Sequence, residues 1–318
     1  MKDIWTTPSW QSGPVRLADH IELVALHSPR RRLSAGDIIA SFDRREDEDE
    51  DRFERPVEDA FQELANRIDH LGRAVTLYPF ELLSDEIRVR SDSFRENEDW
   101  LYLFLLLATA LNMRDERKHE GLDGAELFER LSSEVASRYF GGAKDERVRT
   151  MVFGTARFHS AQDGGEPDVD SFSAAVNELC AELGEGRSFR AKTAKKIRAQ
   201  DDKLDVAVWR QFSDKRAAKL IGFGQCKTGT HWGSELPRLN PGSFCNRWFD
   251  TNPAVEPVKL FFLCDRVAGD ITHEGYEAGV LFDRCRILDY AEELPAKLLA
   301  DCVRWTNAAA QKVGLHIR

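Results

Sequence analysis

Three polar residues stand at the ends of two apolar runs within residues 203–229. Asp205 opens the first run, and Gln225 and Lys227 close the second. If residues 204–209 and 219–227 pair as a hairpin, the two-residue period of a strand places Gln225 and Lys227 on one face. A carboxylate, an amide and an ammonium that converge in an apolar sheet are costly to bury unless they find partners or hold an ion. The spacing therefore predicts a polar site at one end of a sheet.

This arrangement resembles the PD-(D/E)XK nuclease superfamily over residues 170–290. The core of that superfamily is a helix, a three-stranded meander, a crossover helix and a further strand. The resemblance implies an α/β fold with a restriction-endonuclease-like mixed sheet flanked by helices. It also implies that Asp205 and Gln225 bind Mg²⁺ or Mn²⁺. Lys227 is then expected to orient or activate the attacking water during hydrolysis of DNA.

Gln225 is the position at which the sequence departs from the commoner pattern of that superfamily. An acid usually stands there, whereas a glutamine amide offers the ion a neutral carbonyl oxygen and removes one negative charge, so we expect weaker metal affinity. The same Q-x-K form occurs in a branch that includes modification-dependent restriction enzymes and other defence nucleases. The resemblance thus implies a role in restriction or anti-phage defence. The alternatives are a catalytically inactive binding or assembly module in a defence complex, and a nuclease that acts on RNA.

A third acidic metal ligand is implied by the resemblance on the helix before the meander. Apolar residues at helical spacing predict a helix over residues 171–183. Glu178 and Glu182 flank its apolar face, and their sequence setting favours Glu178 as the ligand. A solvated position on the helix surface is the alternative for both.

Basic residues are concentrated immediately before Asp205. Residues 186–200 hold six lysines and arginines and no acid. Each Lys or Arg that neutralises a phosphate adds salt-sensitive affinity for nucleic acid. Lys195, Lys196 and Arg198 are therefore predicted to contact the DNA backbone, with a solvated loop as the alternative.

The residues beside Lys227 offer further chemistry. Thr228 and His231 are candidates for contact with DNA phosphates, and Trp232 either stacks on a base or packs under the sheet. Cys226 is a possible thiol nucleophile, but the alternation of a strand turns it away from Lys227 and favours a core position. The sequence contains no phosphate-binding loop, hydrolase elbow or zinc-protease motif.

The net charge of −10 is unevenly distributed along the 318 residues. Residues 1–150 carry 22 Lys+Arg against 32 Asp+Glu, while residues 151–318 carry 23 of each. Within residues 186–232 the balance becomes 12 basic against 4 acidic side chains. The asymmetry indicates that the acidic first half shields the basic site or docks a partner such as a helicase or sensor protein. A homo-oligomer is also a possible arrangement, since paired nuclease sites suit double-strand cutting.

The periodicity divides the chain into two predicted parts. A mainly helical, acidic region covers residues 1–158, a nuclease domain covers residues 170–318, and a polar stretch joins them. The segment HIELVALHS, residues 20–28, is predicted to be an edge strand or an extended arm. Apolar spacing predicts helices at 57–71, 97–112, 123–140, 171–183 and 295–311, and strands at 204–209, 220–227, 258–264 and 279–287.

The composition sets the broad class. With 42% hydrophobic and 31% charged residues, the sequence is typical of a globular protein and not of a disordered or fibrous one. The six cysteines show no C-x-x-C spacing and are expected to be reduced core thiols. Apolar segments fall short of the roughly 20 residues needed to cross a bilayer, and the N-terminus has no apolar leader segment. We therefore predict a cytoplasmic location without membrane contact.

Overall fold

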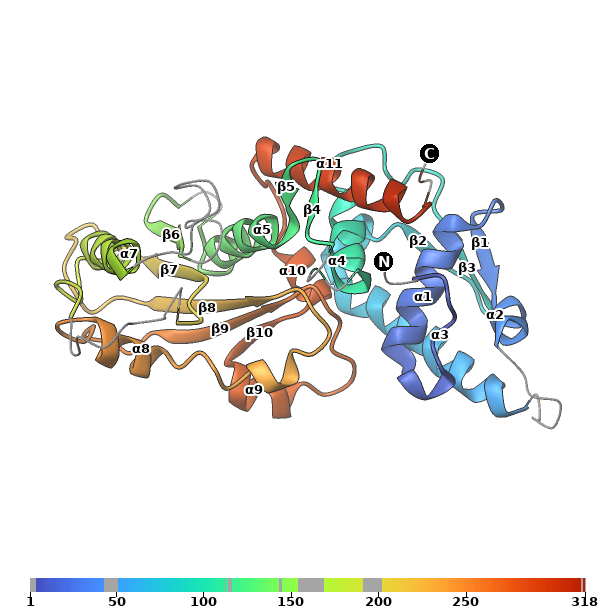
Figure 1. Cartoon of the computed structure of the whole chain (residues 1–318), viewed down its shortest axis with the longest axis horizontal. Coiled ribbons are helices and arrows are strands. Elements are labelled where there is room, and N and C mark those ends of the chain that lie inside the picture. Colours follow the sequence, from blue (N-terminus) through green and yellow to red (C-terminus); the bar gives the residue numbers. More distant parts are fainter. Residues whose placement is uncertain are drawn as a thin grey trace.

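The structure is a computed structural model, and it describes residues 4–42, 51–111, 113, 116–142, 145–153, 169–190, 202–315 and 317. The first part of the chain is mainly helical, as predicted, and includes two small sheets with strand orders β1-β3-β2 and β4-β5 (Figure 1). Its elements are η1 (Trp10–Ser12), α1 (Pro14–His27), β1 (Arg32–Ser34), α2 (Ala35–Ser41), α3 (Asp51–Leu71), η2 (Gly72–Leu77), β2 (Phe80–Leu82), β3 (Glu86–Val89), α4 (Trp100–Ala110), β4 (Lys118–His119), β5 (Leu122–Asp123) and α5 (Gly124–Tyr139).

A five-stranded mixed sheet dominates the second part, and its strand order is β10-β9-β8-β7-β6. Strands β6, β7 and β8 are antiparallel neighbours, whereas β8, β9 and β10 run parallel. The predicted α/β class with a mixed sheet is therefore confirmed. The strands are β6 (Val148–Val152), β7 (Val206–Arg210), β8 (Ile221–Lys227), β9 (Val258–Leu263) and β10 (Val280–Phe282).

The two edge strands differ from the sequence-based expectation. The strand predicted over residues 279–287 ends at Phe282, because the Asp283 side chain accepts a hydrogen bond from the Arg286 amide and begins α10 (Arg284–Asp289). The prediction that the strand continues over residues 283–287 is therefore wrong. At the other edge, β6 was not predicted, since its sequence VRTMV is short and lacks regular apolar alternation.

Helices cover both faces of the sheet. Val206 and Val208 of β7 belong to a core cluster that also contains apolar residues of α5. Ala207 and Trp209 point to the opposite face and pack with apolar residues of α7 (Val169–Leu183) and α8 (Pro241–Trp248). The alternation of side chains along a strand accounts for this division. Two short elements lie near this second face, η3 (Gly233–Glu235) and α9 (Thr272–Ala278).

The segment HIELVALHS is helical, so the predicted edge strand or extended arm is wrong. It forms most of α1, which begins at Pro14, where a missing amide proton costs nothing. Asp19 and Glu22 are as deeply buried as the apolar residues of this helix. Because charged residues occur on its buried side, the helical period is hidden from a reading based on hydrophobicity.

A buried ion network surrounds these two acids. Arg67 of α3 lies 2.9 Å from both Asp19 and Glu22, and Arg284 of α10 lies 2.8 Å from Asp19. Burial alone would raise the pKa of Asp19, but Arg284 and Arg67 outweigh it and lower that pKa to about 2. Burial dominates at Glu22 and raises its pKa. Glu63 extends this group through ion pairs with Arg67 and Arg266. We call the whole set the buried ion network; its members are Asp19, Glu22, Glu63, Arg67, Arg266 and Arg284.

The last helix, α11 (Ala296–Lys312), lies across α4 and α5 (Figure 1). Trp305 meets Phe104 edge to face, with ring centroids 5.3 Å apart. One core cluster thus joins residues from both sides of the predicted boundary. The predicted linker, 159–170, lies outside the described residues except at its last two positions. Strand β6 and helix α5 come before this linker in the chain, yet β6 is part of the five-stranded sheet and α5 packs on it. In the described ranges, we find no helix with the length and apolar character needed to cross a bilayer.

Candidate functional site

Asp205 lies directly before β7 and is held in the sheet by its backbone. Its amide donates to the Gly224 carbonyl at 2.9 Å, and its carbonyl accepts from the Phe153 amide at 2.7 Å. Its side-chain Oδ2 accepts a hydrogen bond from the Cys226 amide at 2.6 Å. Only 7% of the residue is exposed. The predicted carboxylate is therefore buried at the junction of β7 and β8.

Gln225 is fully buried on β8, between the extension of β7 on one side and Phe261 of β9 on the other. The register that pairs Val206 with Gly224 places Asp205 opposite Gln225. Neither Nε2 nor Oε1 of Gln225 meets a hydrogen-bonding partner among the described residues. Leaving a buried polar group unsatisfied costs about 1–3 kcal/mol. The Gln225 amide is thus buried in the core, and no hydrogen bond from the described residues offsets the cost of burying it.

Lys227 lies two residues further along β8, as predicted, and is partly exposed. Its Nζ forms an ion pair with Glu235 Oε2 of η3 at 3.0 Å, and Arg238 approaches the other oxygen of Glu235 at 2.8 Å. Partial burial acts to raise the pKa of Glu235, but the hydrogen bond from Lys227 and nearby positive charges lower it overall. Sequence reasoning did not find Glu235, because no strand or helix period links it to the predicted site.

A second acid that the sequence-based analysis missed is Glu129 of α5. Burial raises the pKa of the Cys226 thiol well above its usual value, and the nearby charges of Asp205 and Glu129 add to this effect. Both carboxylates therefore lie close enough to the Cys226 thiol to affect its pKa, but Glu129 lies on the α5 side of the sheet, whereas the strand alternation places Gln225 and Lys227 on the other side. Because β6 pairs with β7 and comes before α7 in the chain, α5 and not α7 precedes the three antiparallel strands β6, β7 and β8. Cys226 itself packs against the core cluster on the α5 side, as the strand alternation predicted.

The other predicted site residues are less closely connected to this group. Glu178 and Glu182 lie on the exposed side of α7, opposite the apolar side that packs on the sheet. After the end of β8, Thr228 is half-buried and His231 is exposed. The predicted phosphate-binding residues Lys195, Lys196 and Arg198 lie outside the described residues. The roles of all these residues stay predictions.

Oxygen ligands for a metal ion are present, but they do not form a dense acidic cluster. In the part of the chain that the structure describes, no group of three or more His, Cys, Asp or Glu side chains could hold a metal ion. Asp205 and Gln225 offer one carboxylate and one amide oxygen. That pair fits Mg²⁺, which is commonly bound by one or two carboxylates and completes its shell with waters and substrate phosphates.

Comparison with known proteins gives no further guide to this site. No protein-family model, curated protein or solved structure matches the chain. A buried carboxylate, a buried amide oxygen without a hydrogen bond from the described chain and a partly exposed ammonium are groups of the kinds that bind a divalent cation and a phosphate.

Proposed function

We propose that the protein is a metal-dependent DNA endonuclease that hydrolyses phosphodiester bonds, with Asp205, Gln225 and Lys227 at its active site. The observation that carries the proposal is the buried Gln225 amide, which finds no hydrogen-bonding partner in the described chain, opposite the buried Asp205 carboxylate. A metal ion between the two side chains would satisfy the amide oxygen and the carboxylate together. Lys227 stands at the end of the same strand, and its partly exposed side chain is the group that would meet a phosphate.

The order of the elements supports this proposal. Helix α5 is followed by the antiparallel strands β6, β7 and β8, then by α8 and by β9, which runs parallel to β8. This order resembles the helix, meander, crossover helix and further strand of the PD-(D/E)XK superfamily, except that α7 stands between the first two strands. We therefore propose a restriction-endonuclease-like fold. A role in restriction or anti-phage defence, with a partner protein on the N-terminal region, is proposed on the same resemblance.

Each residue has a distinct role in this reaction. Mg²⁺ or Mn²⁺, when bound, would neutralise charge on the scissile phosphate and supply a water for in-line attack. Asp205 and Gln225 would hold the ion through their oxygens, and waters and a substrate phosphate would complete its shell. Lys227 would leave Glu235 to orient the water or to stabilise charge on the phosphate.

Plasmid cleavage in the presence of Mg²⁺ or Mn²⁺ tests this function directly. Wild-type protein should cut DNA, and Lys227→Ala should not, although it should fold normally because Lys227 is partly exposed. Lys312→Ala is the matched control, since Lys312 is also a partly exposed lysine that pairs with an acid, Glu116, but lies on α11. Equal cleavage by wild type and Lys227→Ala would show that the activity belongs elsewhere.

A binding or assembly module with an inactive site is the second candidate. It is favoured by the neutral Gln225 amide and by the ion pair in which Glu235 already engages Lys227. DNA binding without cleavage under either metal, measured with and without the N-terminal partner once it is identified, would support this function instead. A parallel RNA substrate distinguishes a ribonuclease from both.

A further inference from the structure

Trp232, in the loop that follows Lys227, is tied to the N-terminal half through Asp265. The indole Nε1 of Trp232 donates a hydrogen bond to Asp265 Oδ2 at 2.9 Å. Asp265 follows β9 and is 1% exposed. It also accepts two hydrogen bonds from the Arg16 guanidinium of α1, at 3.1 and 2.5 Å. One buried carboxylate thus joins an N-terminal helix to the loop beside the candidate site.

The same loop reaches Lys227 through Glu235. The Glu235 amide donates to the Trp232 carbonyl at 2.8 Å, which closes the η3 turn. The Glu235 carboxylate then meets Lys227 Nζ at 3.0 Å. A continuous series of contacts therefore runs from Arg16 through Asp265, Trp232 and Glu235 to Lys227.

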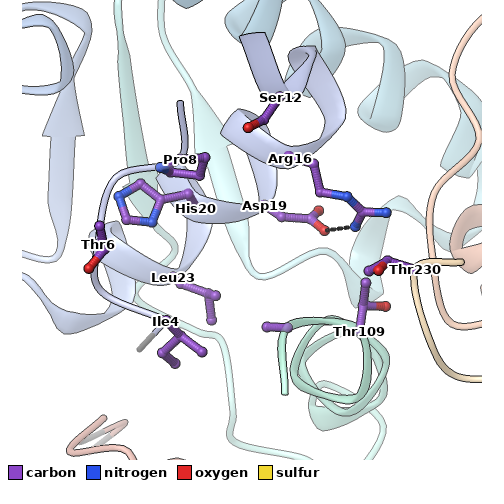
Figure 2. Close-up of a pocket in the computed structure, with 11 residues that line it drawn as sticks. Ile4, Thr6, Pro8, Ser12, Arg16, Asp19, His20, Leu23, Thr109 and Thr230 are labelled. Atoms are coloured by element: carbon purple, nitrogen blue, oxygen red, sulfur yellow. Dashed lines mark ion pairs between the residues drawn. The ribbon is translucent and has the colours of Figure 1, made fainter. Parts of the chain in front are cut away.

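A cavity of about 280 Å³ lies beside Arg16, between α1, the end of α4 and the loop residue Thr230. Figure 2 shows the Arg16 side chain extending from α1 toward the segment that carries Thr230. The Arg16 side chain is 30% exposed, and its guanidinium lies 3.8 Å from Asp19, farther than from Asp265. Because packing leaves one side of Arg16 open, Asp265 is the main group that fixes its position.

We propose that Asp265 is a positioning residue that couples helix α1 to Lys227 through the loop at residues 228–235. Arg16 holds the Asp265 carboxylate, the carboxylate holds the Trp232 indole, and the turn that begins at Trp232 presents Glu235 to Lys227. Hydrogen bonds to charged groups are stronger than neutral ones, so the bonds from Arg16 and from Trp232 to Asp265 all contribute to this order. The catalytic consequence rests on the proposed nuclease function, whereas the ordering of the loop does not.

The loop has a second support, which limits the expected effect. Leu236 is buried in a small cluster with Phe261 and Leu263, and its carbonyl accepts a hydrogen bond from Lys259. Loss of the Asp265 contact should therefore loosen the loop rather than unfold it. The effect should be largest between Thr228 and Glu235, on the side that Asp265 holds.

Hydrogen exchange of the peptide that covers residues 228–236 tests the coupling in the full chain. Arg16→Met removes both hydrogen bonds from Arg16 to Asp265, Trp232→Phe removes the one from the indole, and each variant keeps most of the side-chain volume. We expect exchange of that peptide to become about tenfold faster in both variants. Arg304→Met and Trp5→Phe are the matched controls, because Arg304 is in surface ion pairs and the Trp5 indole donates to the Val313 carbonyl. Unchanged exchange in Arg16→Met would overturn the proposal.

Cleavage kinetics and a double variant separate positioning from general destabilisation. Trp232→Phe should lower kcat about tenfold with little change in KM for DNA, since only the placement of Lys227 changes. Because both residues act through Asp265, the double variant should lose no more than the larger single loss. Additive losses would overturn the coupling. Faster exchange of the loop in a protein that cuts neither DNA nor RNA would support the coupling and reject the proposed function.

Discussion

The buried ion network and the candidate site both place charged or polar groups in the core, but they differ in how those groups are satisfied. In the network, Arg67 contacts three carboxylates and Arg284 makes two hydrogen bonds to Asp19. In the site, Gln225 is equally buried, and both polar atoms of its amide stand without a hydrogen-bonding partner in the described chain. The polar groups of the network are thus paired, whereas the Gln225 amide beside Asp205 has no hydrogen bond from the described chain.

This difference separates stability from function. A buried ion pair gains little over an apolar replacement of both partners, but removal of one partner leaves an uncompensated charge in the core. An unsatisfied amide has the opposite property, because its removal relieves a cost. The two regions should therefore respond in opposite directions when their polar groups are deleted.

The largest effect on stability is expected in the network. Arg284→Met should lower the free energy of unfolding by about 3–5 kcal/mol, because it leaves the buried Asp19 carboxylate short of a partner. Denaturant unfolding followed by circular dichroism measures this loss. Arg73→Met is the control, since Arg73 makes an exposed ion pair with Asp289 and should cost under about 1 kcal/mol. Similar losses in the two variants would contradict the structural role of the network.

The largest effect on activity is expected at Asp205. Asp205→Asn removes the charge that would hold a metal ion, yet it keeps an oxygen that can accept from the Cys226 amide. Cleavage should fall by about 10²–10³-fold, while the melting temperature stays close to that of wild type. Asp123→Asn keeps the cap of α5 but removes the buried charge that pairs with Arg117, so it should lower stability and retain cleavage. The reverse pattern in these two variants would assign Asp205 to the fold instead.

A smaller effect is expected from acid. The Asp19 pKa is lowered to about 2 in the folded protein from an ordinary value of 3.8, so its ionised form stabilises the fold. That contribution is complete above the ordinary pKa, and it is lost as the pH falls through the range from 3.8 to 2. It amounts to about 2 kcal/mol. Unfolding measured across this range should show the loss in wild type and a smaller loss in Asp19→Asn, and parallel curves would contradict it.

The smallest effect, and the one of opposite sign, is expected at Gln225. Gln225→Leu should raise the free energy of unfolding by about 1–2 kcal/mol, because it replaces an unsatisfied amide with an apolar group of similar size. The same variant should lose cleavage. Gln62→Leu on the exposed surface of α3 is the control and should give no gain in stability. A loss of stability in Gln225→Leu would show that the amide has a structural partner.

The parts of the fold that could be predicted are those whose apolar period is local. The sequence predicted α3, α5 and α11 and the central strands β7, β8 and β9, because their buried residues repeat at the spacing of one element. The triplet Asp205, Gln225 and Lys227 was visible for the same reason, since polar residues interrupt two such strands.

The parts that were missed depend on partners far away in the sequence. Arg284 pairs with Asp19 across 265 positions, so neither residue shows by itself that it is buried. This pairing also explains the error at α1, whose charged residues conceal its burial. Glu129 was overlooked because α5 can be recognised as the helix before the antiparallel strands only once β6 is known to pair with β7.

The contact between α4 and α11 also affects how the protein is made. Residues 100–109 of α4 are buried all around the helix, and Trp305 of α11 supplies part of their cover. A ribosome synthesises α4 long before residues 296–312 exist, so the nascent chain carries a strongly apolar helix whose cover is incomplete for most of translation. Productive folding of the first half is therefore expected to finish only after α11 has emerged, and holdase chaperones have a natural target in α4 until then.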